Sequence, residues 1–270
     1  MTKILLTGAN GGVGRRLRRL LPAFYPNLRL SDLTPPDDLQ PHEEFVAADL
    51  ADLAQVEAAV AGVDGIIHLG GLSTEYDWAD ILQSNIIGAY NLFEAARKHN
   101  VRRVVFPSSN QAVGFYPRHR RLGTDVTVRP SSRYGLSKAF GEAVAALYAD
   151  KHGLRTLCIR IGRVHDLPED ERRLALWISP RDFVQLIRIG LEHPDIHFDL
   201  VYGLSSNDRS WYDNTRAYEL GYSPEDRAED HREHAMAEQA KLVRNPLADR
   251  FMGGRLCTVE YSGDLERSGT

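Results

Sequence analysis

The start of the chain joins a short apolar strand to a run of glycines. Residues 3–7 (Lys-Ile-Leu-Leu-Thr) are predicted as a buried strand, and a glycine-rich turn follows directly, before a helical pattern at 15–21. The turn contains Gly8, Gly11, Gly12 and Gly14. In a βα unit of this kind, small residues let the backbone approach a pyrophosphate at the helix N-terminus. The spacing is GxxGxxG rather than GxGxxG, so a plain glycine-rich turn is the alternative; the flanking strand and helix favour the nucleotide-binding interpretation.

Strand and helix patterns then alternate. Further strands are predicted at 27–32, 44–48, 65–69, 102–107 and 156–161, and helices near 53–61, 80–99 and 134–151. The alternation predicts an α/β fold with a doubly wound, Rossmann-like parallel sheet, which the strand at 156–161 closes. We expect residues 1–161 to form a dinucleotide-binding domain that includes the catalytic residues. Residues 162–270 are expected to form a small substrate-binding lobe and C-terminal extension packed on the same domain.

The second strand ends on Asp32, 18 residues beyond Gly14. A carboxylate at this position accepts hydrogen bonds from the adenosine ribose hydroxyls and repels a 2′-phosphate, which favours NAD over NADP. The alternative is a cap in the polar stretch that follows. After the third strand, Asp49 and Leu50 offer a carboxylate for the adenine amino group, and Leu69, Gly70 and Gly71 follow the fourth strand.

Tyr134 and Lys138 have the spacing YxxxK, one turn apart on a predicted helix face. A tyrosine has an ordinary pKa of about 10 and is a poor base at neutral pH unless a nearby cation stabilises its phenolate. We therefore expect Lys138 to lower the pKa of Tyr134. The pair alone is weak evidence for a catalytic site, because tyrosine and lysine often occur at this spacing as solvated neighbours on a helix. Its position downstream of a nucleotide-type turn and of Ser108 and Ser109 favours a redox enzyme.

The composition excludes several classes of function. The formal net charge is −4 in 270 residues, which argues against a nucleic-acid or membrane-surface role. Cys158 and Cys257 cannot make a disulfide framework, and no stretch has the length of a membrane span, so we expect a cytoplasmic protein. His231 and His234 are spaced i, i+3 without a third ligand nearby, which is more typical of a solvated helix face, and we predict no metal.

At this point the chain resembles the extended short-chain dehydrogenases/reductases. The resemblance rests on TGANGGVG at 7–14, Asp32, Asp49-Leu50, HLGG at 68–71, SSNQAVG at 108–114 and YGLSK at 134–138. More narrowly, HLGGLSTE, ILQSNIIGAYNLFEAAR, SSNQAVGFYP, RLALWIS and FMGGR are similar to the uronate-oxidising members of that family. The resemblance implies NAD-dependent oxidation of D-galacturonate or D-glucuronate at C1 to the aldaro-lactone.

The resemblance also implies roles for single residues. Tyr134 would be the base, assisted by Ser109 and Lys138. The cofactor would be held by Gly8, Asn10, Gly11, Gly12, Val13, Gly14, Asp32, Asp49, Leu50, Leu69, Gly70, Gly71, Asn85, Tyr134 and Lys138. The substrate would be held by Ser73, Ser109, Asn110, Gln111, Tyr134, Arg163 and Arg172. For Asn85 the alternative is a helix cap, and for Arg172 it is a surface charge.

Two positions depart from the uronate-oxidising pattern. Gln111 replaces a histidine, and Arg163 replaces a small serine. The two changes would retune the anion site, for example toward a sulfonated hexose; alternatively, Arg163 pairs with Asp166 or Glu169 and takes no part in the chemistry. A nucleotide-sugar epimerase or dehydratase shares the fold and the YxxxK pair, but only about 110 residues follow the sheet here, which is short for a nucleotide-sugar lobe. The apolar faces of the helices near 80–99 and 134–151 are compatible with a homo-oligomer.

Overall fold

The computed structural model describes residues 2–41 and 43–268. Its central sheet contains strands from residues 3 to 203, in the order β3-β2-β1-β4-β5-β6-β9. The strands are β1 (Lys3–Thr7), β2 (Asn27–Asp32), β3 (Glu44–Ala47), β4 (Gly65–His68), β5 (Arg103–Ser109), β6 (Arg155–Ile161) and β9 (Phe198–Gly203), with a separate pair formed by β7 (Arg163–Val164) and β8 (Trp177–Ile178).

The register of the first strands determines where their following loops leave the sheet. β1 pairs in parallel with β2 and β4, and Thr7 lies opposite Ser31 on one side and His68 on the other. The apolar residues of β1 are buried, as expected for a strand covered on both faces. The loops after β1, β2 and β4 therefore leave the same edge of the sheet. The predicted parallel sheet is confirmed.

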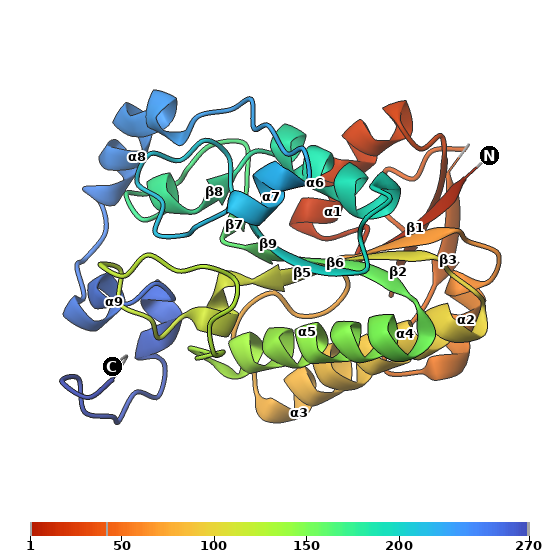
Figure 1. Cartoon of the computed structure of the whole chain (residues 1–270), viewed down its shortest axis with the longest axis horizontal. Helices are drawn as coiled ribbons and strands as arrows, with labels where there is room; N and C mark the ends of the chain where they lie inside the picture. The colour runs from red at the N-terminus through yellow and green to blue at the C-terminus, as the bar shows by residue number, and fades with distance from the viewer. Residues whose placement is uncertain (1, 42, 269–270) are drawn as a thin grey trace. The chain divides into compact units, whose positions relative to one another are not determined.

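Helices flank the sheet, as α4 and α5 do along one face (Figure 1). The α-helices are α1 (Gly12–Leu20), α2 (Leu53–Val60), α3 (Trp78–Ile81), α4 (Gly88–Lys98), α5 (Arg133–His152), α6 (Pro180–Glu192), α7 (Thr215–Glu219), α8 (Arg232–Gln239) and α9 (Pro246–Arg250). Short 3₁₀ turns include η3 (Asn110–Val113), η4 (Arg173–Ala175) and η6 (Gly254–Thr258). In the described part of the chain, no helix combines the length and apolar character that crossing a membrane requires.

The helix predicted near 80–99 is interrupted. Its first turn is α3, its last turns are α4, and the residues between them, Leu82–Ile87, form a π-helix, η2. Such a segment adds a residue to the turn and redirects the side chains that it carries. It carries Asn85, which is buried.

The chain divides into two compact units that interleave along the sequence. The first contains residues up to Pro107, Phe140–Cys158 and Ile187–Asp199; the second contains Ser108–Ala139, Ile159–Leu186 and the residues from Leu200 onward. The chain enters and leaves each unit several times, and the expected functional division between residues 161 and 162 stays a prediction. Ser109, Tyr134 and Lys138 belong to the second unit.

The strand at Arg155–Ile161 was expected to be the last of the sheet, and this expectation is wrong. Phe198–Gly203 forms β9, at the end of the strand order. Only its last three residues are buried, and Asp199 breaks the apolar run. The pattern was too short to be distinguished from a loop.

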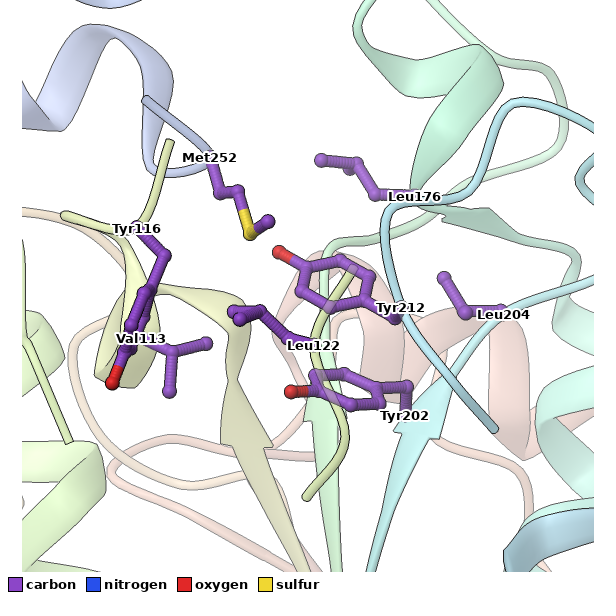
Figure 2. Packing of buried hydrophobic residues seen from close by; sticks show 8 residues of the cluster. All are labelled: Val113, Tyr116, Leu122, Leu176, Tyr202, Leu204, Tyr212 and Met252. Carbon is purple, nitrogen blue, oxygen red and sulfur yellow. The ribbon is translucent and has the colours of Figure 1, made fainter. Parts of the chain in front are cut away.

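The second unit has its own apolar core (Figure 2). It consists of Val113, Tyr116, Leu122, Leu176, Tyr202, Leu204, Tyr212 and Met252. Tyr202 and Tyr212 stack with ring centroids 4.1 Å apart. Met252 brings the C-terminal segment into this core, and the Tyr212 hydroxyl points toward its side chain (Figure 2).

Candidate active site

The glycine turn after β1 forms a close backbone contact that excludes a side chain. Gly8 has φ +66°, and a Cβ atom on it would lie 2.6 Å from the carbonyl carbon of Leu69. Gly11 is the N-cap residue of α1 and makes no side-chain capping bond, and Gly12, Val13 and Gly14 are the first residues of the helix. The first N–H groups of a helix have no intrahelical partners, and here no side chain at the cap covers them. This geometry fits the diphosphate of a dinucleotide.

Asp32 lies at the end of β2, beside this turn. Its Oδ2 accepts a hydrogen bond from the backbone N–H of Asn10 at 2.9 Å, and its Oδ1 accepts one from Leu33 at 2.8 Å. The carboxylate is partly exposed. It retains acceptor capacity for ribose hydroxyls, since a carboxylate has about four lone-pair sites.

The loops after β3 and β4 have different exposures. Asp49 is exposed, and its Oδ1 accepts a hydrogen bond from the N–H of Ala51 at 2.9 Å. The Leu50 side chain lies close to Gly70, where a Cβ would be 2.8 Å from Leu50 Cδ1. Gly70 donates its N–H to Thr7 Oγ1 at 3.0 Å. The Leu50 side chain therefore packs against the backbone of Gly70, and Asp49 is the polar group available to a ligand.

Asn85 fixes the loop that follows β4. Its Oδ1 accepts from the N–H of Leu72 at 2.8 Å, and its Nδ2 donates to the carbonyl of Leu72 at 2.9 Å. The π-helical turn directs this side chain toward the loop, and no side-chain cap is recorded at the start of η2. The helix-cap alternative is therefore wrong. Ser73, on the same loop, is exposed.

In the second unit, Ser109 and Tyr134 form a hydrogen-bonded pair. Ser109 ends β5, and its hydroxyl also accepts from the N–H of Gln111 at 3.1 Å. Tyr134 stands in the first turn of α5, where Ser132 Oγ accepts from the N–H of Gly135 at 3.0 Å and caps the helix. Burial raises the pKa of Tyr134 to about 12, and the hydrogen bond from Ser109 partly opposes that rise.

The lysine has a different relation to Tyr134 from the one expected. Lys138 Nζ lies 5.8 Å from the centroid of the Tyr134 ring. In the cofactor-free protein burial outweighs any lowering of the Tyr134 pKa, so the net lowering expected from Lys138 is not seen in this state. The ammonium stands over the ring, as in a cation–π contact.

Arg172 is held by a carbonyl from the C-terminal segment. Its Nε and Nη2 both donate to the Met252 oxygen, at 3.0 and 2.5 Å. Burial, with a smaller contribution from the neighbouring Arg173, lowers the pKa of Arg172 to about 10. Among the ion pairs of residues 2–41 and 43–268, none includes Arg172. A partly buried guanidinium without a carboxylate is suited to an anionic ligand.

Asn110 and Gln111 connect the Ser109 region to the same segment. Asn110 Nδ2 donates to the Met252 carbonyl at 3.4 Å, and Gln111 Nε2 donates to the Gly253 carbonyl at 3.1 Å. The Ser131 hydroxyl donates to Gln111 Oε1. Both ends of the Gln111 amide are thus bonded to the protein. A continuous set of contacts runs from Tyr134 through Ser109 and Asn110 to Met252 and Arg172.

Arg163 forms one of the two ion pairs expected for it, and its role toward the substrate stays a prediction. Its Nε and Nη2 form a two-pronged pair with the Glu169 carboxylate. Its side chain is 43% exposed. The guanidinium is therefore neutralised by Glu169.

Several residues in this set had no predicted role. Met252, Gly253, Ser131 and Tyr212 lie far from Arg172 or Gln111 in sequence, and the FMGGR motif was noticed only as a resemblance. The two adjacent glycines of this motif, Gly253 and Gly254, are the sequence feature that points to a special backbone conformation there. The Tyr212 hydroxyl is buried, and it makes no hydrogen bond of normal geometry to a described residue.

The histidines singled out in the sequence have ordinary contacts. His231 packs edge-on against Trp177, with ring centroids 5.5 Å apart. Within the described ranges, no group of three or more His, Cys, Asp or Glu side chains is arranged to hold a metal ion.

Comparison with known proteins identifies the class. A model of the NAD dependent epimerase/dehydratase family matches residues 4–180. The chain belongs to this family. Uronate dehydrogenase of Pseudomonas putida is 46% identical over 245 residues, which cover 90% of this chain and 91% of the relative. Uronate dehydrogenase of Agrobacterium fabrum is 46% identical over 254 residues, 94% of this chain and 96% of the relative. Within the larger family, the chain is a member of the uronate dehydrogenases.

A solved structure agrees over the same length. A tyrosine-to-alanine mutant of the uronate dehydrogenase from Agrobacterium tumefaciens, complexed with NAD, has a TM-score of 0.91 and 45% identity to this chain. The match covers 96% of this chain and 97% of that one. The Rossmann-like fold is therefore shared from end to end.

Proposed function

We propose that the protein oxidises a hexuronic acid, D-galacturonate or D-glucuronate, at C1 with NAD and forms the aldaro-lactone. The observation that carries the proposal is the continuous set of contacts in the second unit. It connects the buried Ser109–Tyr134 pair, through Asn110 and Met252, to an arginine without a carboxylate partner. The relatives named uronate dehydrogenase support the same reaction.

NAD fits the residues of the first unit. The turn at Gly8–Gly14 would receive the diphosphate, Asp32 the adenosine ribose and Asp49 the adenine amino group. The Leu69–Gly71 backbone would lie against the cofactor, and Asn85 would hold the Leu72 peptide that continues this wall. When bound, NAD supplies the acceptor for the hydride that leaves C1.

The chain's own groups would handle the proton. The C1 hydroxyl proton would move to Tyr134 Oη as the C1–H bond breaks, and Ser109 would orient the reacting oxygen. At neutral pH the buried Tyr134 is protonated in the cofactor-free protein. Cofactor and substrate binding must therefore change its surroundings, and Lys138 supplies the nearby positive charge.

The state of the two candidate arginines favours a substrate with a single carboxylate at C6. Arg163 is neutralised by Glu169, whereas Arg172 forms no ion pair among the described residues. Asn110 would add a neutral amide donor, and Ser73 would contact the sugar as a further substrate-binding residue. A single unpaired guanidinium favours a substrate with one negative charge, such as a carboxylate, over a more highly charged substrate. A sulfonated hexose carries the same single charge and is the second candidate.

A substrate panel tests the proposal. NADH absorbance would be followed with galacturonate, glucuronate, a 6-sulfonated hexose, the matching neutral hexoses and a nucleotide sugar. We expect turnover with at least one uronate and much weaker turnover with neutral hexoses. Activity only with the sulfonated hexose, or conversion of the nucleotide sugar without net NADH, would replace the proposal with one of its alternatives.

Assembly and location are also part of the proposal. Tyr90 of α4 and Leu147 of α5 are 47% and 46% exposed, which supports a homo-oligomer built on these helices. Light scattering tests this state. We also keep the cytoplasmic location as a prediction.

A further inference from the structure

The amide of Gln111 has a defined orientation in the second unit. The Gly253 carbonyl can only accept a hydrogen bond, so the group that faces it at 3.1 Å must be the amide nitrogen. The amide oxygen then accepts from the Ser131 hydroxyl. Gln111 is 8% exposed, and a substrate would have to displace a protein contact to bind the hydrogen-bonded atoms of this amide.

The peptide that Gln111 holds is next to the one that holds Arg172. Met252 donates its N–H to the Tyr116 carbonyl at 2.9 Å, and Gly253 donates its N–H to the Gly114 carbonyl at 2.8 Å. These backbone bonds fix one side of the segment, and Gln111 fixes the Gly253 carbonyl on the other. The segment is therefore restrained on both sides of the carbonyl that Arg172 contacts.

Arg172 is sensitive to the position of this segment. Its Nε and Nη2 share the Met252 oxygen, so that oxygen sets the direction of the guanidinium plane. Gly254 follows with φ +65°, and a Cβ atom on it would lie 2.8 Å from Arg172 Nε. The approach is close enough that a small rotation of the 252–254 backbone would turn the guanidinium.

We propose that Gln111 is a positioning residue for substrate recognition, which holds the Gly253 carbonyl so that the Met252 carbonyl aims Arg172 at the substrate's carboxylate. The inference rests on the proposed function, because it takes the anion at Arg172 to be the C6 carboxylate of a uronate. Gln111 touches neither cofactor nor substrate in this role. Its effect reaches the substrate through one peptide and one guanidinium.

The test compares a variant that loses both contacts of the amide with one that loses a single contact. Gln111→Met keeps the length of the side chain and loses both the donor to Gly253 and the acceptor for Ser131. Ser131→Ala leaves that donor and removes the opposite contact. We expect Gln111→Met to raise KM for the uronate roughly tenfold, with kcat within about threefold of wild type, which corresponds to one lost hydrogen bond. Ser131→Ala should change KM by less.

Two further measurements separate positioning from a general structural effect. The Kd for NAD and the activity toward a neutral hexose should be unchanged in Gln111→Met, since neither involves Arg172. In an Arg172→Gln background, Gln111→Met should have no further effect on kcat/KM for the uronate, because the two residues act in series. The inference would be overturned if the effects of Gln111→Met and Arg172→Gln on kcat/KM were additive in the double variant. It would also be overturned if Gln111→Met lost the same factor in kcat/KM with the uronate and with the neutral hexose.

The outcomes distinguish this inference from the proposed function. If the wild-type protein oxidises no uronate, the proposed function fails first. If it oxidises a uronate and Gln111→Met leaves KM unchanged while its fold is intact by circular dichroism, only the positioning role of Gln111 fails.

Discussion

The backbone N–H of Asn10 donates to the Asp32 carboxylate at 2.9 Å, which joins the glycine turn to the end of the second strand. The same carboxylate is the group expected to repel a 2′-phosphate. It thus has a structural contact on one oxygen and a selective role through its charge. These two roles can be separated by substitution.

The variant Asp32→Asn keeps a side-chain acceptor for Asn10 and removes the negative charge. We expect its preference for NAD over NADP, measured as the ratio of kcat/KM values, to fall roughly tenfold or more, because a like-charge contact is lost. Initial rates with both cofactors check this. Wild-type protein that uses NADP as efficiently as NAD would contradict the role assigned to Asp32.

Asn85 provides a second prediction about the cofactor side. Asn85→Ala removes both hydrogen bonds to Leu72, and we expect the free energy of unfolding to fall by about 1–3 kcal/mol. The Kd for NAD should rise, since the loop after β4 loses its restraint. Urea unfolding and fluorescence titration measure the two effects. An unchanged Kd for NAD in a destabilised variant would limit Asn85 to a structural role.

Removal of the Tyr134 hydroxyl should separate binding from chemistry. Tyr134→Phe is expected to lower kcat by about 10²–10⁴-fold, the usual contribution of a general base. The Kd for NAD should stay near its wild-type value, because the hydroxyl is not the main cofactor anchor. Steady-state rates and a cofactor titration on the same preparation check both. A wild-type-like kcat would refute the assigned base.

The pKa of Tyr134 predicts the pH profile. Burial raises this pKa to about 12 in the cofactor-free protein, whereas kcat/KM for the sugar at saturating NAD reports the protein–NAD complex, in which Lys138 and the cofactor change the surroundings of Tyr134. Because the base must lose its proton, log kcat/KM should rise with pH from about pH 6. The raised pKa also stabilises the folded protein below the ordinary tyrosine pKa of about 10, and this contribution is lost as the pH rises through the folded value. A kcat/KM that does not rise with pH would show that a different step limits the rate.

Tyr212 offers a matched pair with Tyr202. The Tyr212 hydroxyl is buried beside the Asn110 side chain and makes no hydrogen bond of normal geometry to a described residue, whereas the Tyr202 hydroxyl donates to the Gly123 carbonyl at 2.9 Å. We expect Tyr212→Phe to leave the free energy of unfolding unchanged or to raise it by about 1 kcal/mol, and Tyr202→Phe to lower it by about 1 kcal/mol. Urea unfolding curves of both variants check this. A loss of stability in Tyr212→Phe would reveal a partner such as a buried water.

Much of the fold could be predicted because it depends on local patterns. The strand at Lys3–Thr7 has a clear apolar run, and the turn that follows it is marked by its glycines. The π-helical turn at Leu82–Ile87 could not be predicted, because an inserted residue leaves the surrounding helical pattern almost unchanged. β9 was missed because its short run contains Asp199.

The site was less predictable where its contacts cross long stretches of chain. The alternatives for Arg163 included Glu169, but the choice between Asp166 and Glu169 depends on backbone geometry. The pKa of Tyr134 was expected to be lowered by Lys138 because the spacing is local. Burial, which depends on the whole unit, outweighs that spacing.

The sequence by itself determined the alternation of strands and helices up to residue 161, the glycine turn and the residue types at the strand ends, because these follow from neighbours along the chain. Only the tertiary structure decided which backbone carbonyl Arg172 contacts, 80 residues away, and which peptide Gln111 holds, 142 residues away. Such partners are chosen by packing and by the need to satisfy buried polar groups. Neither requirement leaves a periodic signal in the sequence.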